Sequence, residues 1–230
     1  MAFVKAVVFD FDDTLVHSGW TSYNSHCRAA RKLGLPKPAL KQFLKYWGKS
    51  WHSMIEAIWP GADINEFIRT YRSLRLKSRY PLVYGAVDTI DFLYERRIPM
   101  GIVSNKPTED LVQRISHTAL NPHVFAFVFG EQSTIFHKPH ARAFDEVKEF
   151  FSRKRIRSNE ILYVGDLTVD YFAARGAGLQ FVGVLSGFHS KRMFLKEGLG
   201  DEWVLDSVAE LPRFLLHANL LPVNRRRSVL

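Results

Sequence analysis

Two carboxylates separated by one residue follow the first apolar run of this chain. The run Ala6 to Phe9 leads directly into Asp10, and Asp12 comes two residues later. Two carboxylates that close repel each other unless a cation or a shared proton compensates. At the end of a buried strand, such a pair indicates either a bound divalent metal or paired nucleophile and acid chemistry.

A later apolar run also ends in acidic residues. Ile161 to Val164 is followed by Gly165 and Asp166, and Asp170 lies one helical turn further along. Hard cations such as Mg²⁺ are bound by a few carboxylates together with waters and substrate oxygens. A second acidic strand end in the same sheet therefore strengthens the prediction of a magnesium site.

Two other segments carry groups that suit an anion. Ser104 and Asn105 follow the apolar run that begins at Gly101, and a hydroxyl and backbone amides at a helix start can donate to phosphoryl oxygens. Lys138 precedes Pro139, which we expect in the first turn of a helix, where it would hold the lysine in place. That charge could neutralise a phosphate and a nearby carboxylate together.

The elements needed to bring these residues together alternate between strand and helix. Strands separated by helices form βαβ units, and such units give a parallel sheet whose strand ends share one edge. We therefore predict an α/β fold with a Rossmann-like parallel sheet. The expected strands are Ala6–Phe9, Met100–Ser104, Phe125–Phe129, Ile161–Val164 and Phe181–Val184, and the expected helices are Ala86–Glu95, Thr108–Thr118, Ala141–Phe151, Val169–Arg175 and Ser207–Leu216.

A purely helical block interrupts this pattern after the first strand. It contains four apolar stripes with helical spacing, starting at Trp20, Leu40, Trp51 and Ile64, and we interpret their aromatic residues as helix core. We predict that residues 18–80 form a helical cap domain with its own core. Residues 1–17 and 81–230 would form the α/β domain, and the cap would overhang the carboxyl edge of its sheet.

Composition limits the class of protein. The chain has 230 residues, of which 47% are hydrophobic, and its single cysteine, Cys27, excludes an intrachain disulfide. It lacks an apolar run long enough to cross a membrane, and the early first strand leaves no room for a signal peptide. We therefore expect a soluble protein in the cytoplasm, a monomer or homodimer, with no membrane partner.

The formal net charge is +9. Such a field draws in anionic substrates and could bind nucleic acid without sequence preference. Solvated helix faces explain the basic clusters more simply, so nucleic-acid binding is the less favoured interpretation. The clusters are Arg28-Arg31-Lys32, Arg69-Arg72-Arg75-Lys77-Arg79, Arg153-Lys154-Arg155-Arg157 and Arg225-Arg226-Arg227.

The four segments together resemble the motifs of the haloacid dehalogenase superfamily. Their order is Asp-x-Asp-x-Thr, Ser-Asn, Lys-Pro and Gly-Asp-x-x-x-Asp, and the chain looks most like the phosphoglycolate-phosphatase branch with its helical cap after the first motif. The resemblance covers residues 3–216. The chain departs from the commoner Asp-x-Asp-Gly-Thr by carrying Asp13 in place of glycine. The family tolerates this change, which would alter the hinge between the α/β domain and the cap.

The resemblance implies a magnesium-dependent phosphatase that acts on a small phosphorylated metabolite. Asp10 would be the nucleophile that forms an aspartyl phosphate, and Asp12 the general acid and base. The implied metal ligands are Asp10, the backbone carbonyl of Asp12, and Asp166. Asp170 would orient a metal-bound water or the lysine. The implied phosphoryl-binding groups are Ser104, Asn105 and Lys138.

Substrate choice would fall to the cap. Lys49 lies in the turn Trp47 to Trp51, where related proteins carry a specificity loop, and it could meet a second anionic group. An exposed lysine in an ordinary helical turn explains the same residues equally well.

Other activities stay open at this point. The carboxylates Asp12, Asp166 and Asp170 argue against carbon–halogen hydrolysis, which needs neither a metal nor a second acid. A sugar phosphomutase remains an alternative within the superfamily. A non-catalytic binding protein is disfavoured because every expected catalytic group is present, and a nucleic-acid-associated protein is motivated only by the charge.

Overall fold

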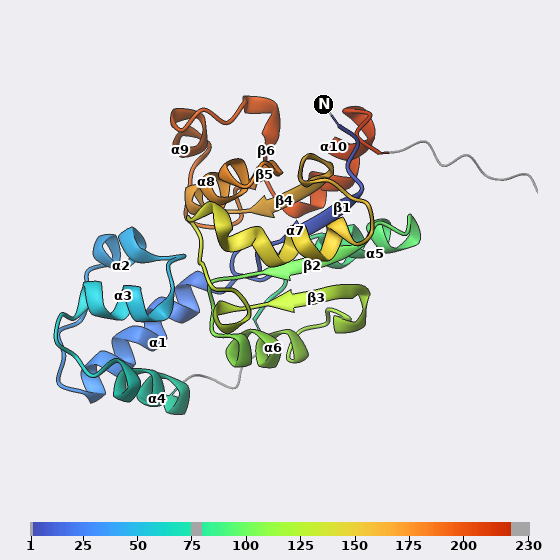
Figure 1. Ribbon diagram of the computed structural model, residues 1–230. Coiled ribbons are helices and arrows are strands. Elements are labelled where there is room, and N and C mark those ends of the chain that lie inside the picture. Colours follow the sequence, from blue (N-terminus) through green and yellow to red (C-terminus); the bar gives the residue numbers. More distant parts are fainter. Residues whose placement is uncertain (1, 75–79, 222–230) are drawn as a thin grey trace, which may run out of the picture.

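The computed structural model describes residues 2–74 and 80–221. Within these residues a six-stranded sheet, parallel throughout, has the strand order β3-β2-β1-β4-β5-β6 (Figure 1). The strands are β1 (Ala6–Phe9), β2 (Met100–Val103), β3 (Phe125–Phe129), β4 (Ile161–Gly165), β5 (Gln180–Val184) and β6 (Val204–Leu205). This arrangement confirms the predicted Rossmann-like α/β fold.

The sheet register brings the predicted chemical segments to one edge. Phe9 in β1 pairs with Ile102 in β2 and with Val164 in β4. The residues that follow these partners therefore emerge together at the carboxyl ends of three neighbouring strands. The chain order reverses at β1, and such a switch point is where open α/β sheets bind their ligands.

Helices cover both faces of the sheet. Helices α5 and α10 pack on each other on one face, whereas α7 and α8 lie on the other face and meet through a 3-10 turn (Figure 1). The helices around the sheet are α5 (Ala86–Glu95), α6 (Thr108–Ser116), α7 (Asp145–Ser152), α8 (Thr168–Gly176), α9 (Lys191–Lys196) and α10 (Leu211–His217). Apolar strands β1, β2 and β4 are fully buried between them, as the sequence predicts.

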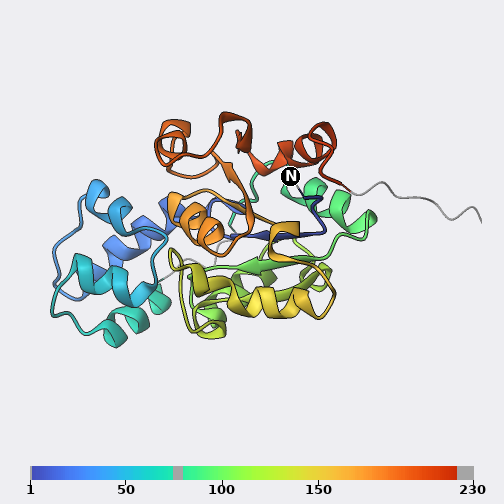
Figure 2. The same ribbon diagram turned by 45° about the horizontal axis from the view of Figure 1, so that its top comes forward.

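Four helices form a separate unit beyond the carboxyl ends of β1 to β4 (Figures 1 and 2). They are α1 (Gly19–Lys32), α2 (Leu40–Tyr46), α3 (Trp51–Ile58) and α4 (Ile64–Leu74). The unit has its own hydrophobic core, which includes Phe43, Ile55 and Phe67. The inserted helical cap of the predicted fold class is therefore present, and below "the cap" means helices α1 to α4 with their connections.

Trp20 corrects the prediction that the cap's aromatic stripes are core. Its side chain is 58% exposed, and its ring meets Phe188 of the α/β domain at a centroid distance of 5.5 Å. The residue starts the first stripe in α1, but it points toward the joint between cap and sheet domain. The periodicity of a helix identifies its apolar face and cannot say which neighbour that face meets.

Several predicted elements have different bounds. The expected helix at 141–151 begins as a 3-10 turn, Ala141–Phe144, before α7. The expected last helix at 207–216 divides in the same way, into the 3-10 turn Val208–Glu210 and α10. The sequence prediction omitted α9 and the edge strand β6, which are six and two residues long, because periodicity is weak over so few residues.

Some sequence predictions concern residues that lie outside the described part of the chain. These are the basic residues Arg75, Lys77 and Arg79 and the cluster Arg225 to Arg227. Among the described residues, no helix combines the length and the apolar character that a membrane span requires.

Candidate active site

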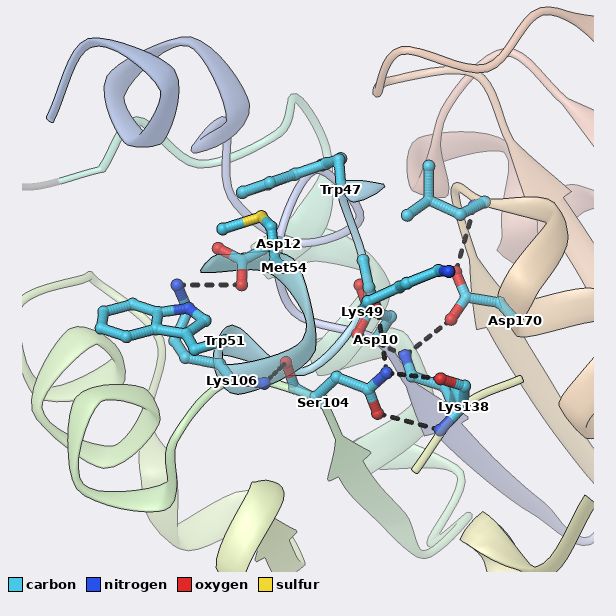
Figure 3. A pocket seen from close by; sticks show the side chains of 13 residues that line it. Asp10, Asp12, Trp47, Lys49, Trp51, Met54, Ser104, Lys106, Lys138 and Asp170 are labelled. Atoms are coloured by element: carbon cyan, nitrogen blue, oxygen red, sulfur yellow. Dashed lines mark hydrogen bonds and ion pairs between the residues drawn. The ribbon is translucent and has the colours of Figure 1, made fainter. Parts of the chain in front are cut away.

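Asp10 is the first residue after β1 and is almost fully buried. Its backbone amide still donates to the carbonyl of Val164, so the sheet fixes its position. The Lys138 ammonium lies 2.8 Å from Asp10 Oδ1 and 2.6 Å from Asp170 Oδ1 (Figure 3). It also donates to the Tyr163 hydroxyl at 2.7 Å. The structure thus joins segments that are more than 100 residues apart around one lysine.

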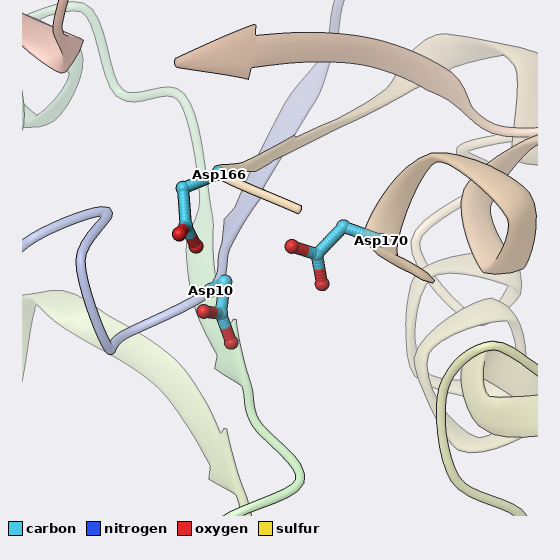
Figure 4. A group of neighbouring side chains, drawn as sticks. All are labelled: Asp10, Asp166 and Asp170. Carbon is cyan, nitrogen blue, oxygen red and sulfur yellow. The ribbon is translucent and has the colours of Figure 1, made fainter. Parts of the chain in front are cut away.

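Three aspartates converge at the ends of β1 and β4. One carboxylate oxygen from each of Asp10, Asp166 and Asp170 lies within 4.8 Å of the other two, and all three residues are buried (Figure 4). Asp170 is held by the backbone amide of Leu167, which donates to its Oδ2 at 3.0 Å. Three carboxylates this close repel one another unless protons or cations compensate, and Lys138 supplies one positive charge.

This cluster fits a divalent cation. Asp166 Oδ2 is buried and has no hydrogen-bond partner among residues 2–74 and 80–221. A Cβ atom at Gly187 would collide with the same oxygen, so glycine there leaves the space around it open. Carboxylate oxygens are the donors that hard cations prefer, so Asp10 and Asp166 are suited to hold Mg²⁺.

The pKa values of the buried carboxyls also fit a bound cation. Burial raises the pKa of Asp10 to about 7, against the opposing charge of Lys138. Burial and the neighbouring carboxylates raise the pKa of Asp166 well above its ordinary value. Burial disfavours the charged form of Lys138, but its ion pairs with Asp10 and Asp170 outweigh that cost and raise its pKa. A bound divalent cation would stabilise both ionised carboxyls.

Asn105 connects three parts of the molecule. Its side-chain amide donates to the carbonyl of Gly48 in the cap at 2.7 Å and to the carbonyl of Lys138 at 2.8 Å. The Lys138 backbone N–H in turn donates to Asn105 Oδ1 at 3.0 Å. Ser104 lies at the end of β2 beside it, buried, and its hydroxyl accepts from the Lys106 backbone N–H at 3.2 Å.

Pro139 corrects the prediction for the third motif. The helical structure begins two residues later, at Ala141, and the Lys138–Pro139 peptide is cis. Pro139 therefore does not lie in a first helical turn. The lysine is held by the Asn105 side chain instead, which binds both the N–H and the carbonyl of Lys138.

Asp12 lies apart from the three clustered carboxylates. Its Oδ2 forms an ion pair with the ammonium of Lys106 at 3.0 Å, and the lysine is buried. The sequence prediction gave Lys106 no role, nor Tyr163. A usable signal was present for both: Lys106 extends the polar run at the end of β2, and Tyr163 places a hydroxyl in an otherwise apolar strand.

Asp13 occupies the position where the commoner motif has glycine. Its φ is +57°, in the left-handed region that glycine adopts freely and aspartate tolerates better than most residues. Its Oδ1 accepts from the backbone amides of Ser18 and Gly19 at the start of α1. The aspartate thus supplies a link between the loop after β1 and the first cap helix that glycine could not.

The cap closes the site. A cavity of about 40 Å³ remains between the two units, lined by carboxylates and lysines from the sheet domain and by aromatic residues from the cap (Figure 3). The turn predicted as a specificity loop lies there, and Lys49 contributes to the lining although it is an exposed residue. The cap residues that line the cavity are Trp47, Gly48, Lys49, Trp51 and Met54.

A Rossmann-like sheet with a carboxylate cluster at its switch point, beneath an inserted helical cap, defines a class of α/β hydrolases. The family model of the haloacid dehalogenase-like hydrolases matches residues 7–184. The chain therefore belongs to this family, as the sequence motifs predict.

Curated relatives narrow the class of reaction. The phosphoglycolate phosphatase of Pectobacterium atrosepticum is 25% identical over 196 residues, which cover 81% of this chain and 82% of that protein. The phosphoglycolate phosphatase of Xanthomonas campestris pv. campestris strain 8004 is 28% identical over 223 residues, which cover 92% and 95%. Family and relatives together identify the chain as a hydrolase of the phosphatase type.

A solved structure supports the fold. The crystal structure of a haloacid dehalogenase-like hydrolase from Bacteroides fragilis matches with a TM-score of 0.78 and 21% identity, over 90% of this chain and 99% of that one. At this level of identity the likeness concerns the fold alone.

Proposed function

We propose that this protein hydrolyses a small phosphomonoester with Mg²⁺, through an aspartyl phosphate on Asp10. The observation that carries the proposal is the buried cluster of Asp10, Asp166 and Asp170 with Lys138 among them. Uncatalysed hydrolysis of phosphate monoesters is slow enough to need accelerations of up to about 10²¹-fold. A dense group of fixed charges is what such a reaction requires.

Asp10 acts as the nucleophile. Its carboxylate attacks phosphorus, the bond to the leaving alcohol breaks, and water later hydrolyses the aspartyl phosphate, so that one difficult step becomes two easier ones. Its backbone hydrogen bond to Val164 and its ion pair with Lys138 hold the attacking oxygen in place. Such fixed positioning lowers the entropic cost of in-line attack.

Asp10, Asp166 and the backbone carbonyl of Asp12 hold the metal, and Asp170 orients Lys138. When bound, Mg²⁺ offsets the repulsion between the carboxylate and the phosphate and polarises the phosphoryl group. The partnerless Asp166 oxygen and the open space at Gly187 support this assignment.

Three residues bind the transferring phosphoryl oxygens. Lys138 provides positive charge, Ser104 a hydroxyl and Asn105 its backbone amide. Preorganised donors of this kind are usually the largest single contribution to catalysis. The double hydrogen bond between Asn105 and the Lys138 backbone supports the view that these donors act as one rigid unit.

Asp12 protonates the leaving alcohol and then takes a proton from the attacking water. The second oxygen of its carboxylate, Oδ1, is buried and has no partner in the described part of the chain, which leaves it free for this exchange.

The cap selects the substrate and excludes water. We assign residues 18–80 to the cap domain and residues 1–17 and 81–230 to the catalytic domain. Lys49 meets a second negative charge on the leaving group, a role that its position in the cavity lining supports. The curated relatives make phosphoglycolate the first substrate to test. A cytoplasmic monomer or homodimer is part of the same proposal.

The test is release of inorganic phosphate from a panel of phosphomonoesters, with and without Mg²⁺. The panel holds phosphoglycolate, sugar phosphates, nucleotides and phosphorylated vitamins. Asp10→Asn abolishes turnover, whereas Asp88→Asn on the exposed face of α5 leaves it unchanged. Full activity of Asp10→Asn, or activity that survives chelation of the metal, would contradict the proposal.

The alternatives give different results in the same experiment. A sugar phosphomutase would return an isomeric sugar phosphate in place of free phosphate. A nucleic-acid-associated protein would bind duplexes with an affinity that falls steeply as salt rises, and would release no phosphate from small esters.

A further inference from the structure

Lys106 is a buried cation with no role in the mechanism above. It follows Asn105 after β2, and its side chain is 5% exposed. Its ammonium lies 3.0 Å from Asp12 Oδ2 (Figure 3). A lysine is almost never buried to this extent unless its charge is paired, and here the paired group is the proposed acid.

The backbone around Lys106 is fixed from two sides. Its N–H donates to the Ser104 hydroxyl at 3.2 Å, and its carbonyl accepts from the N–H of Glu131 at 2.8 Å. The ammonium also lies 5.9 Å from the centre of the Tyr80 ring, whose negative face attracts cations. Lys106 therefore offers Asp12 a rigid partner.

The ion pair engages only one half of the Asp12 carboxylate. Oδ2 is bound to Lys106, whereas Oδ1 is buried and has no hydrogen-bond partner in the described residues. Both residues line the same cavity as Asp10. Because Lys106 anchors Oδ2, rotation of the Asp12 side chain is restricted. The orientation of Oδ1 is therefore fixed as well.

We infer that Lys106 is a positioning residue, which holds Asp12 so that its free oxygen meets the leaving group. The inference rests on the proposed function of Asp12 as acid and base. A correctly placed general acid contributes roughly 10²- to 10⁴-fold, and it matters most when the leaving alcohol is a poor one. Loss of Lys106 therefore harms the hydrolysis of alkyl esters far more than that of nitrophenyl esters.

The experiment compares Lys106→Met with the wild-type protein on a series of phosphate esters, from 4-nitrophenyl through phenyl to alkyl phosphates. We expect kcat/KM, which covers only the steps up to formation of the aspartyl phosphate, to fall by roughly 10²-fold for the alkyl phosphate and much less for the nitrophenyl ester. Lys154→Met removes an exposed charge near the end of α7 and serves as the matched control, with no change for any ester.

A double-mutant cycle connects the effect to Asp12. If Lys106 acts through Asp12, the double variant Asp12→Asn/Lys106→Met and the single variant Asp12→Asn should show the same dependence of rate on the leaving group. Lys106→Arg keeps the charge near Asp12 and restores part of the selectivity toward alkyl esters, which also covers the case in which the methionine variant folds poorly.

Two outcomes would overturn the inference. An equal loss of kcat/KM for every ester at unchanged KM would assign Lys106 a structural role only, and an equal loss that arises from a rise in KM alone would make it a binding residue for the phosphoryl group. In both cases the wild type still hydrolyses esters with Mg²⁺, so the proposed function stands. Failure of the proposed function itself is recognised by the absence of phosphate release from the wild type.

Discussion

The carboxylates at the end of the sheet outnumber the cations beside them. Asp10 and Asp170 share Lys138, and Asp12 pairs with Lys106. Within residues 2–74 and 80–221, the Asp166 carboxylate receives only one long hydrogen bond, of 3.4 Å, from the Thr14 hydroxyl. This excess of carboxylates supports the proposed cation site, and the stability of the protein should then depend on whether the site is filled.

The metal-free protein should lose stability as pH rises toward neutrality. The pKa of Asp10 is raised from 3.8 to about 7, so between these values the folded state binds more protons than the unfolded state. The free energy of unfolding then falls with rising pH across this window, and Mg²⁺ restores it. Thermal unfolding from pH 5 to pH 8, in chelator and in Mg²⁺, measures the effect.

Asp166→Asn provides the comparison for that series, because it replaces a buried carboxyl of raised pKa with a neutral side chain of the same shape. One pKa unit corresponds to about 1.4 kcal/mol, and 1 kcal/mol to roughly 2–4 °C in Tm for a chain of this size. In chelator at neutral pH the variant should melt several degrees above the wild type and gain little from Mg²⁺. Equal melting curves for both proteins would count against the cluster as a metal site.

At the scale of elements, the sequence predicts what is long or strongly patterned. Helix α5 and strand β3 have the predicted bounds, and all four cap helices follow their apolar stripes. The motif residues reach one site because parallel strands end at one edge. The Lys106–Asp12 pair joins positions that lie far apart in the sequence, and neither local spacing nor propensity encodes such a contact.

The cap loop between α2 and α3 touches the sheet domain at Gly48. Its φ is +86°, and a Cβ atom there would collide with the side chain of Leu167. In Gly48→Ala we expect a cost of roughly 1–2 kcal/mol from the left-handed backbone. The clash also displaces the loop, so kcat/KM should fall as well.

Gly61→Ala is the matched control for this loop. Gly61 has a φ of +82°, but a Cβ atom there would meet nothing within 4 Å. The left-handed backbone should lower the Tm of the Gly61→Ala variant about as much as it lowers that of Gly48→Ala. The kcat/KM of Gly61→Ala should stay at the wild-type value. Equal kinetics for both variants would show that the Gly48 contact does not serve catalysis.

At the scale of the whole molecule, polar contacts connect the cap to the sheet domain. Arg72 Nε in α4 donates to Asp110 Oδ2 in α6 at 3.0 Å, and Asn105 donates to the Gly48 carbonyl. His52 Nδ1 in α3 lies 3.4 Å from Glu131 Oε1 in the sheet domain. These contacts hold the cap against the sheet domain and favour the closed arrangement, so substrate entry requires some of them to open.

Arg72→Met should weaken closure without disturbing the chemistry. An ion pair of this exposure contributes up to about 1 kcal/mol, so KM should rise by at most about fivefold while kcat changes little. Arg69→Met, an exposed position on the same helix, is the control and should leave both constants unchanged. A fall in kcat at constant KM would instead assign Arg72 to the chemical step.

The central claim is that Asp10 becomes covalently phosphorylated during turnover. The direct measurement is to stop the reaction with Mg²⁺ and substrate present, reduce the protein with borohydride, and sequence its peptides by mass spectrometry. Borohydride converts an aspartyl phosphate to homoserine, so the account predicts homoserine at position 10 and unmodified aspartate at positions 12, 166 and 170. Steady phosphate release with aspartate intact at position 10, or homoserine at another position, would contradict it.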